Sequence, residues 1–212
     1  LGHDVVLAPA SHCYFDFYQD APPSQPEAIG GYLPFDDVAQ FPHDALLPDS
    51  LRSRMLGVQG NLWTEYVPTP AAAQRMLYPR LLALAEIGWC GRRTRPVAEL
   101  RQATIAQTTR LRALGVQPFD LTTEVGQRAE ALRVRHHLAE GATVVYHAPY
   151  AEAYSAAAAL TLTDGQRGGW SYHDGRWQGF TSPMDVTIDL GAVTELSHIF
   201  AKFMQERVQW VY

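Results

Sequence analysis

One stretch of the chain, residues 55–66, places the strongest limit on the fold. Residues 55–59 form a short apolar run of strand length, and polar and aromatic side chains follow it directly. A turn bounded by Pro68 and Pro70 comes next, and then a segment with leucines at helical spacing. A strand that ends in polar residues and leads into a helix is the βα unit of a (β/α)8 barrel. The sequence therefore predicts site residues on a barrel rim.

A second βα unit is predicted near the start of the chain. Residues 5–8 form another apolar run, interpreted as a buried strand parallel to the later one, and residues 11–19 follow it with polar and aromatic side chains. Parallel barrel strands place their C-terminal ends on the same rim. The two polar clusters are therefore expected to lie together.

The two clusters share a spacing. Tyr14 and Asp16 stand two residues apart, as do Trp63 and Glu65, so each pair projects to one side of an extended strand end. An aromatic face beside a carboxylate suits a sugar, which offers C–H faces and hydroxyls. Spacing alone leaves a second interpretation open, in which both aromatics pack at the rim, the tyrosine hydroxyl bonds a backbone carbonyl and the glutamate is solvated.

Two linked motifs resemble the last strand and helix of family-20 glycoside hydrolases, the β-N-acetylhexosaminidases. A third segment, residues 30–34, is similar to one that such enzymes carry in the same place. The linked motifs are Gly57-Val58-Gln59-Gly60-Asn61-Leu62-Trp63-Thr64-Glu65-Tyr66 and Tyr78-Pro79-Arg80-Leu81-Leu82-Ala83-Leu84-Ala85-Glu86. The resemblance implies that residues 1–118 are the last two βα units of a (β/α)8 TIM barrel with its closing helix.

The resemblance also implies roles for four residues. In the family a Tyr-x-Asp ends the seventh strand and faces the sugar, which Tyr14-Phe15-Asp16 matches. Tyr14 is then the catalytic residue that holds the acetamido oxygen of the substrate. Asp16 and Glu65 are the substrate-binding carboxylates that accept sugar hydroxyls, and Trp63 is a wall of the pocket.

The implied reaction is the hydrolysis of terminal non-reducing N-acetylglucosamine or N-acetylgalactosamine by substrate-assisted retaining catalysis, which is an exception to the two-carboxylate scheme. The family uses an adjacent Asp-Glu pair, and no Asp-Glu dipeptide occurs in this sequence. The alternatives are a non-catalytic carbohydrate-binding protein on the same barrel, or another barrel glycosidase. The glycan, its linkage and the oligomeric state are left open.

The second half of the chain has a different period. Residues 143–146 and 185–191 alternate as strands do. Residues 162–169 and 174–180 resemble a discoidin-like or galactose-binding-like β-sandwich, a module often found after such barrels. Their aromatic residues could stack on sugars, but packing inside the sandwich is the favoured interpretation; they are Trp170, Trp177 and Phe180.

The expected fold class is therefore α/β plus all-β. Residues 1–118 form the partial barrel, residues 119–141 a linker, and residues 142–212 a partial jelly-roll sandwich. Neither part reaches the size of its complete fold, so the chain is expected to be a fragment of a longer enzyme.

Composition limits the partners. The net charge is −5 with a pI near 5.9, which gives no reason to expect nucleic-acid binding, and no apolar run is long enough to span a bilayer. No zinc spacing occurs, so neither a metal nor a cofactor is expected. The expected partner is a small-molecule or oligosaccharide substrate with a terminal N-acetylhexosamine. An extracytoplasmic location is favoured by analogy with similar proteins.

Several other residues are interpreted as structural. Cys13 and Cys90 are expected to be buried free thiols. One helix is expected from Thr69 to Trp89, capped by Thr69 and kinked at Pro79. Two charged residues of that helix, Arg80 and Glu86, are assigned to packing, and no role is given to His43 or Asp44. A further helix is expected over residues 97–114, closed by Gly115.

Overall fold

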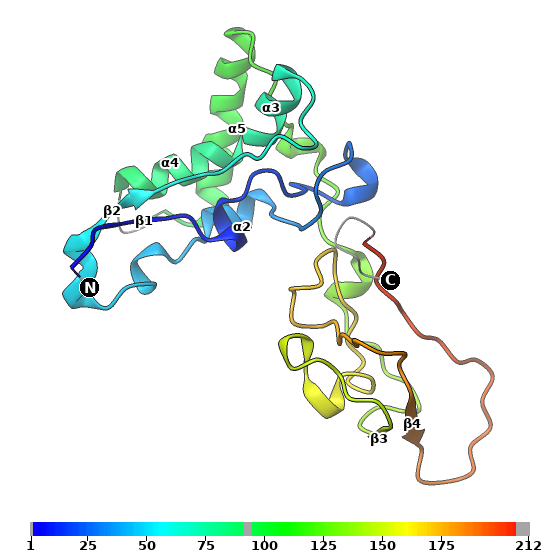
Figure 1. Ribbon diagram of the computed structural model, residues 1–212. Helices are drawn as coiled ribbons and strands as arrows, with labels where there is room; N and C mark the ends of the chain where they lie inside the picture. The colour runs from blue at the N-terminus through cyan, green and yellow to red at the C-terminus, as the bar shows by residue number, and fades with distance from the viewer. Residues whose placement is uncertain (1, 91–94, 207–212) are drawn as a thin grey trace. The chain divides into compact units, whose positions relative to one another are not determined.

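A computed structural model describes residues 2–90 and 95–206 of the protein (Figure 1). The chain divides into two compact units, Leu1–Gly126 and Gln127–Tyr212. The boundary falls inside the segment expected to be a linker, because residues 119–126 belong to the first unit and the residues after them to the second.

The first unit combines two strands with five α-helices in its described residues. They are β1 (Val5–Leu7), α1 (Ala10–Cys13), α2 (Phe35–Ala39), β2 (Met55–Val58), α3 (Pro70–Leu77), α4 (Arg80–Cys90) and α5 (Val97–Ala113). Short 3-10 turns connect them, namely η1 (Pro22–Ser24), η2 (His43–Ala45), η3 (Asp49–Arg54) and η4 (Leu121–Thr123).

β1 and β2 pair in parallel, as the sequence predicts, with Val6 opposite Gly57. The expectation that both strands are buried is only half right. Leu7 and Val58 pack against the hydrophobic core, but Val6 and Leu56 are 49% and 70% exposed. The reason is alternation, because successive side chains point to opposite faces and the helices of this unit cover one face only.

The helices form a layer on that face (Figure 1). α4 packs on β2, and α2 packs against both α4 and α5. Aromatic and aliphatic side chains from the layer and from the loops fill the core between them. The most buried of these include Phe15, Leu33, Phe35, Ala83, Leu84, Ile87, Leu100 and Phe119.

The expectation of one kinked helix from Thr69 to Trp89 is wrong. Thr69 does cap α3, accepting the Ala72 N–H at 3.1 Å, but α3 ends at Leu77 and α4 begins at Arg80. Pro79 lacks an N–H and its ring displaces the preceding turn, so Tyr78 is extended, with φ −96° and ψ 137°. The segment is therefore two helices.

The other local expectations have mixed outcomes. α5 is confirmed, and Gly115 closes it in the left-handed region at φ +82°. Both cysteines are free, but only Cys13 is buried. Cys90 is exposed, which corrects the expectation of a second buried thiol, because the last residue of α4 lies beyond the side chains that cover its apolar face.

The segment after α5 is held against the first unit by a buried carboxylate. Asp20 is 1% exposed and accepts hydrogen bonds from the backbone N–H groups of Val125 and Gly126, at 2.9 and 2.7 Å. The Ser24 hydroxyl donates to the same side chain at 3.2 Å. Asp20 immediately follows the predicted site segment, so this contact also fixes one end of it.

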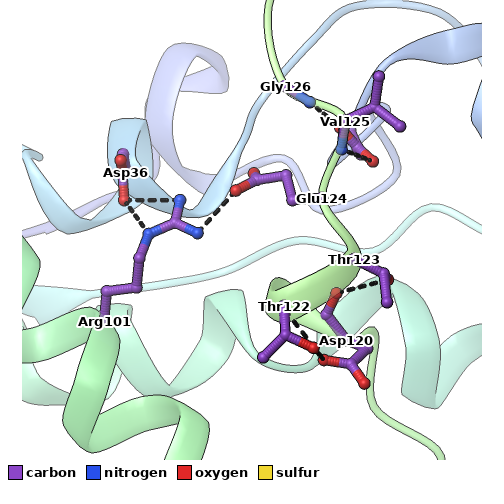
Figure 2. Close-up of polar contacts among 9 residues, drawn as sticks. Asp36, Arg101, Asp120, Thr122, Thr123, Glu124, Val125 and Gly126 are labelled. Carbon is purple, nitrogen blue, oxygen red and sulfur yellow. Dashed lines mark hydrogen bonds and ion pairs between the residues drawn. The ribbon is translucent and has the colours of Figure 1, made fainter.

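A surface network strengthens the same attachment (Figure 2). The Arg101 guanidinium, projecting from α5, binds Asp36 of α2 at 3.0 Å and Glu124 at 2.6 Å. The hydrogen bond and charge of Glu124 help to raise the pKa of Arg101 against the opposing effect of burial. Three separate segments of the first unit are thereby joined.

The second unit contains two strands in its described residues, β3 (Thr143–Tyr146) and β4 (Val186–Asp189), which pair antiparallel. Both lie inside segments predicted to be strands. Three 3-10 turns complete the regular structure, η5 (Ala129–Leu132), η6 (Glu152–Tyr154) and η7 (Ala158–Leu160). The jelly-roll topology remains a prediction.

The three aromatic residues singled out from the sequence of this unit, Trp170, Trp177 and Phe180, are half-buried. The Arg128 guanidinium lies 4.1 Å from the Trp170 ring, and Phe180 stacks on Tyr146 with 6.4 Å between the ring centres. Trp177 lies against Gly168, so close that a Cβ there would overlap the indole. These contacts agree with the packing interpretation.

The Asp20 anchor leads to a stability prediction. In the full-length protein, Asp20→Ala removes the carboxylate that accepts the Val125 and Gly126 N–H groups, and a hydrogen bond to a charged group contributes about 1.5–3 kcal/mol. Amide hydrogen exchange at Val125 and Gly126 should therefore accelerate by roughly tenfold to a hundredfold. Asp120→Ala is the control, because Asp120 caps Thr122 in η4 and pairs with Arg112 on α5, and neither contact involves Val125 or Gly126. Unchanged protection in Asp20→Ala would contradict the anchor.

Candidate active site

The parallel pairing of the two strands continues past their ends and brings the two polar clusters together. The Asn61 N–H donates to the Cys13 carbonyl, and the Phe15 N–H donates to the Asn61 carbonyl, both at 2.7 Å. Tyr14 consequently lies opposite Asn61 in a parallel bridge. The predicted neighbourhood of the clusters is confirmed at the level of the backbone.

Some side chains on either side of the Tyr14–Asn61 bridge enter the core, and others lie outside it. Cys13 and Phe15 are fully buried in the core, and Leu62 packs against it. A Cβ at Gly60 would lie 2.6 Å from the Phe15 ring, so the backbone approaches the core closely there. Tyr14, between Cys13 and Phe15, is half-buried and does not belong to this core cluster.

The aromatic residues outside the core cluster, Tyr14 and Trp63, are partly accessible to solvent. Trp63 is 54% exposed, so it is not packed under a loop. Tyr14 is half-buried with its ring centre 5.8 Å from that of Phe17, and its hydroxyl has no hydrogen-bond partner in the part of the chain that the structure describes. The Tyr14 ring thus packs near Phe17, as a structural role allows, but its hydroxyl does not bond a backbone carbonyl of the described residues.

Glu65 is exposed, but its backbone differs from the expected extended strand end. The Val67 N–H donates to the Thr64 carbonyl at 3.1 Å, which closes a turn around Glu65. The chain must turn here to reach Thr69, the cap of α3. The Phe17 N–H likewise donates to the Tyr14 carbonyl at 3.3 Å, which closes a turn around Asp16. The expectation that each pair projects from an extended strand end is therefore wrong for both pairs.

Asp16 has the most unusual environment of the four. Its side chain is 5% exposed, and one carboxylate oxygen, Oδ1, is buried without a hydrogen-bond partner among the described residues. Burial raises the pKa of Asp16 and the charge of Glu65 raises it further, whereas its own backbone N–H and Arg80 oppose the shift. A buried acceptor without a partner costs about 1–3 kcal/mol and is typical of a site that a ligand completes.

The arrangement fits a ligand that carries hydroxyl groups. Asp16 and Glu65 can accept hydrogen bonds, and the exposed indole of Trp63, two residues before Glu65, offers a flat apolar face. No group of three or more His, Cys, Asp or Glu suited to a metal ion occurs within residues 2–90 and 95–206. Over the same residues, no helix is long and apolar enough to cross a bilayer.

Arg80 is closer to the site than its place on a packing helix indicates. Its structural role is confirmed, since the guanidinium is completely buried and donates to the backbone carbonyls of Phe15, Phe17 and Leu33. The carbonyls of Phe15 and Phe17 flank Asp16. The one sequence signal was a cation among the apolar positions of α4.

The structure also places several residues to which the sequence assigns a structural role or no role. Gln59 and Asn61, which sequence reasoning left without a role, join at the strand end through a side-chain hydrogen bond of 2.7 Å. Glu86 pairs with Arg95 at 3.5 Å, as a structural residue does. His43 is buried, with Nδ1 3.4 Å from the Phe41 carbonyl, and the side chain of Asp44 lies outside the described set.

The first 92 residues match the family model described as "Glycosyl hydrolase family 20, catalytic domain". These residues, which hold all four predicted site residues, belong to that family, as the sequence motifs indicate. The match ends within the segment that follows α4.

Several known proteins are similar to the same part of the chain. A beta-hexosaminidase of Porphyromonas gingivalis is 43% identical over 91 residues, which are 42% of this chain and 12% of that protein. A beta-hexosaminidase of Vibrio furnissii is 38% identical over 90 residues, or 41% of this chain and 15% of that protein. The chain therefore spans only a small part of the curated relatives that it matches.

Solved structures agree. The exo beta-N-acetylglucosaminidase of Vibrio harveyi, determined in complex with N-acetylglucosamine, matches with a TM-score of 0.51 and 32% identity, covering 55% of this chain and 19% of that one. A beta-N-acetylhexosaminidase of Streptomyces coelicolor matches with a TM-score of 0.51 at 24% identity, which supports the fold alone. The elements of the first unit from β1 to α4 thus lie in the part of the chain that matches a family-20 catalytic domain.

The environment of Asp16 leads to a prediction on pH and stability. Because the folded-state pKa is raised, the native carboxyl binds its proton more tightly than the unfolded chain does, and stability falls as pH rises above the ordinary aspartate range near 4. Asp16→Asn cannot ionise. It should therefore raise the thermal unfolding temperature of the full-length protein at pH 7, and the gain should vanish as pH falls below about 4.

The matched control is Asp185→Asn, a change of an exposed aspartate in the second unit. It should leave the unfolding temperature of the first unit unchanged at both pH values. A loss of stability at pH 7 in Asp16→Asn would show that the ionised carboxylate is already satisfied inside the protein.

Proposed function

We propose that the protein is a β-N-acetylhexosaminidase that hydrolyses terminal non-reducing N-acetylglucosamine or N-acetylgalactosamine residues with retention of configuration. The observation that carries the proposal is the buried Asp16 carboxylate, whose Oδ1 has no hydrogen-bond partner among the described residues, in a segment that matches family 20 and also holds the exposed Trp63. The Vibrio harveyi relative, whose structure holds N-acetylglucosamine, supports the choice of sugar.

In this proposal the substrate acts as its own nucleophile. The acetamido oxygen attacks the anomeric carbon, and Tyr14 donates a hydrogen bond to that oxygen as the oxazolinium ring forms. Its hydroxyl has no partner among the described residues, so it is available for this bond. Asp16 and Glu65 bind sugar hydroxyls, and Trp63 forms a wall of the pocket. The general acid and its partner lie on a part of the protein outside this chain.

The finer architecture belongs to the same proposal. Residues 1–118 are the last two βα units of a (β/α)8 barrel with its closing helix, residues 119–141 a linker, and residues 142–212 part of a discoidin-like jelly-roll sandwich. The parallel pairing of β1 with β2 and the antiparallel pairing of β3 with β4 support this division. Parallel strands with covering helices are typical of barrels, and antiparallel strands of sandwiches.

Substrate assistance predicts a strict requirement for the acetamido group. The full-length protein should hydrolyse a chromogenic β-N-acetylglucosaminide at least about a hundredfold faster than the matching β-glucoside, because proximity of an internal nucleophile lowers the barrier by several kcal/mol. The measurement is kcat/KM for both substrates. Equal rates would indicate an ordinary two-carboxylate glycosidase. Sugar binding without turnover of either substrate would favour a non-catalytic carbohydrate-binding protein.

Glu65→Gln tests the role of the exposed carboxylate. A hydrogen bond to a charged group contributes about 1.5–3 kcal/mol, so kcat/KM for the N-acetylglucosaminide should fall roughly tenfold to a hundredfold. The exposure of Glu65 predicts an unchanged unfolding temperature. The control is Glu86→Gln on α4, which should leave kcat/KM unchanged. Wild-type kinetics in Glu65→Gln would remove Glu65 from the site.

A further inference from the structure

The Arg80 guanidinium is the only fully buried cationic group among the described residues of the first unit. Nη1 donates to the carbonyls of Phe17 and Leu33, at 3.0 and 2.9 Å. Nη2 donates to the carbonyl of Phe15. Nη2 and Nε also donate to the carbonyl of Met76, near the end of α3, at 2.7 and 3.2 Å. One side chain thus holds four backbone carbonyls.

Two of these carbonyls belong to the residues on either side of Asp16. Holding the carbonyls of Phe15 and Phe17 fixes the peptide planes that flank Asp16, so the direction in which its side chain leaves the backbone is fixed as well. The Phe15 ring also lies against the guanidinium, with 5.2 Å from Cζ to the ring centre. Arg80, the first residue of α4, therefore holds the backbone from which the Asp16 side chain projects.

The third carbonyl extends this control to a second loop. Leu33 lies in the glycine-rich segment 30–34, and its N–H donates to the Tyr18 carbonyl at 2.8 Å, while Tyr18 and Tyr32 form a parallel bridge. The guanidinium therefore joins the segment that carries Asp16 to the neighbouring loop. A planar fork with five donors can do this, whereas the three donors of a lysine ammonium cannot reach the same set.

Arg80 also acts on Asp16 through its charge. The charged groups that influence this carboxylate are Glu65, which follows β2, and Arg80 on α4. Glu65 disfavours the ionised form and Arg80 favours it. Burial lowers the pKa of Arg80 to about 9, opposed by Asp16, so the guanidinium is still cationic at neutral pH.

We propose that Arg80 is a positioning residue for substrate binding, which aims the Asp16 carboxylate at the sugar by holding the backbone on both sides of it and by joining it to the 30–34 loop. The inference rests on the proposed function, because it assumes that Asp16 binds a sugar hydroxyl. It adds to that function a residue that touches no substrate.

The test uses the full-length protein with two variants of Arg80. Arg80→Lys keeps the charge and loses the fork, so KM for the chromogenic N-acetylglucosaminide should rise roughly tenfold to a hundredfold while the acidic limb of the kcat/KM profile stays in place. Arg80→Met loses both, so KM should rise and the acidic limb should also move to higher pH, because Asp16 becomes easier to protonate.

The matched control is Arg101→Met. Arg101 also lies against a core phenylalanine, with 5.6 Å from Cζ to the Phe35 ring, and also joins separate segments of the first unit, but it makes no contact with the Asp16 region. This variant should lose thermal stability and keep the wild-type KM and pH profile. A merely structural role for Arg80 would give its variants the same result as Arg101→Met, which would overturn the proposal.

If Arg80→Met does not fold, a double-mutant cycle with Arg80→Lys and Asp16→Asn tests whether Arg80 acts through Asp16. When Arg80 acts through Asp16, Arg80→Lys should raise KM much less in an Asp16→Asn background than in the wild type. Effects that multiply independently would overturn the proposal. A wild-type protein that neither hydrolyses the N-acetylglucosaminide nor binds N-acetylglucosamine would remove the proposed function and, with it, this inference. Wild-type activity with an unchanged KM in Arg80→Lys would remove this inference alone.

Discussion

A guanidinium withdrawn from water must find hydrogen-bond acceptors, and this requirement shapes the first unit around Arg80. Desolvating an ion costs several kcal/mol, and removing the partners of a buried charge is strongly destabilising. Arg80 meets the requirement with the Met76 carbonyl in the preceding helix, α3, and with backbone carbonyls of two loops. Those loops consequently pass close to the start of α4, where Pro79 has ended the preceding helix. The core ring of Phe15 packs on the same guanidinium.

The paired segments then divide their residues between stability and function. Where the paired segments meet, Phe15 and Leu62 enter the core, whereas Tyr14 is half-buried, Trp63 is exposed and Asp16 is buried in the turn that follows Tyr14. The core residues stabilise the unit by burying apolar area. The site residues carry a cost, because a carboxylate oxygen is buried without a partner among the described residues and an indole is left exposed. Such local cost is typical of sites in which binding, and not packing, determines the residues.

Local signals in the sequence predicted local structure well, whereas long-range features needed the fold. Thr69 and Gly115 mark helix ends by their own conformational preferences, so both could be assigned from sequence. The effect of Pro79 was recognised but underestimated, because whether a proline kinks or ends a helix depends on the packing of the segments around it. The turn at Glu65 depends on how the chain enters α3. The contacts of Arg80 join positions up to 65 residues apart along the chain, and no helical pattern reveals them.

The central claim is that Asp16 holds an open acceptor for a sugar. The most direct test is a crystal structure of the full-length protein with N-acetylglucosamine bound. The proposed function predicts that Oδ1 of Asp16 lies within hydrogen-bonding distance of a sugar hydroxyl and that the Trp63 ring lies against the pyranose. A sugar bound elsewhere, or an Oδ1 atom that is hydrogen-bonded to another protein group, would contradict it.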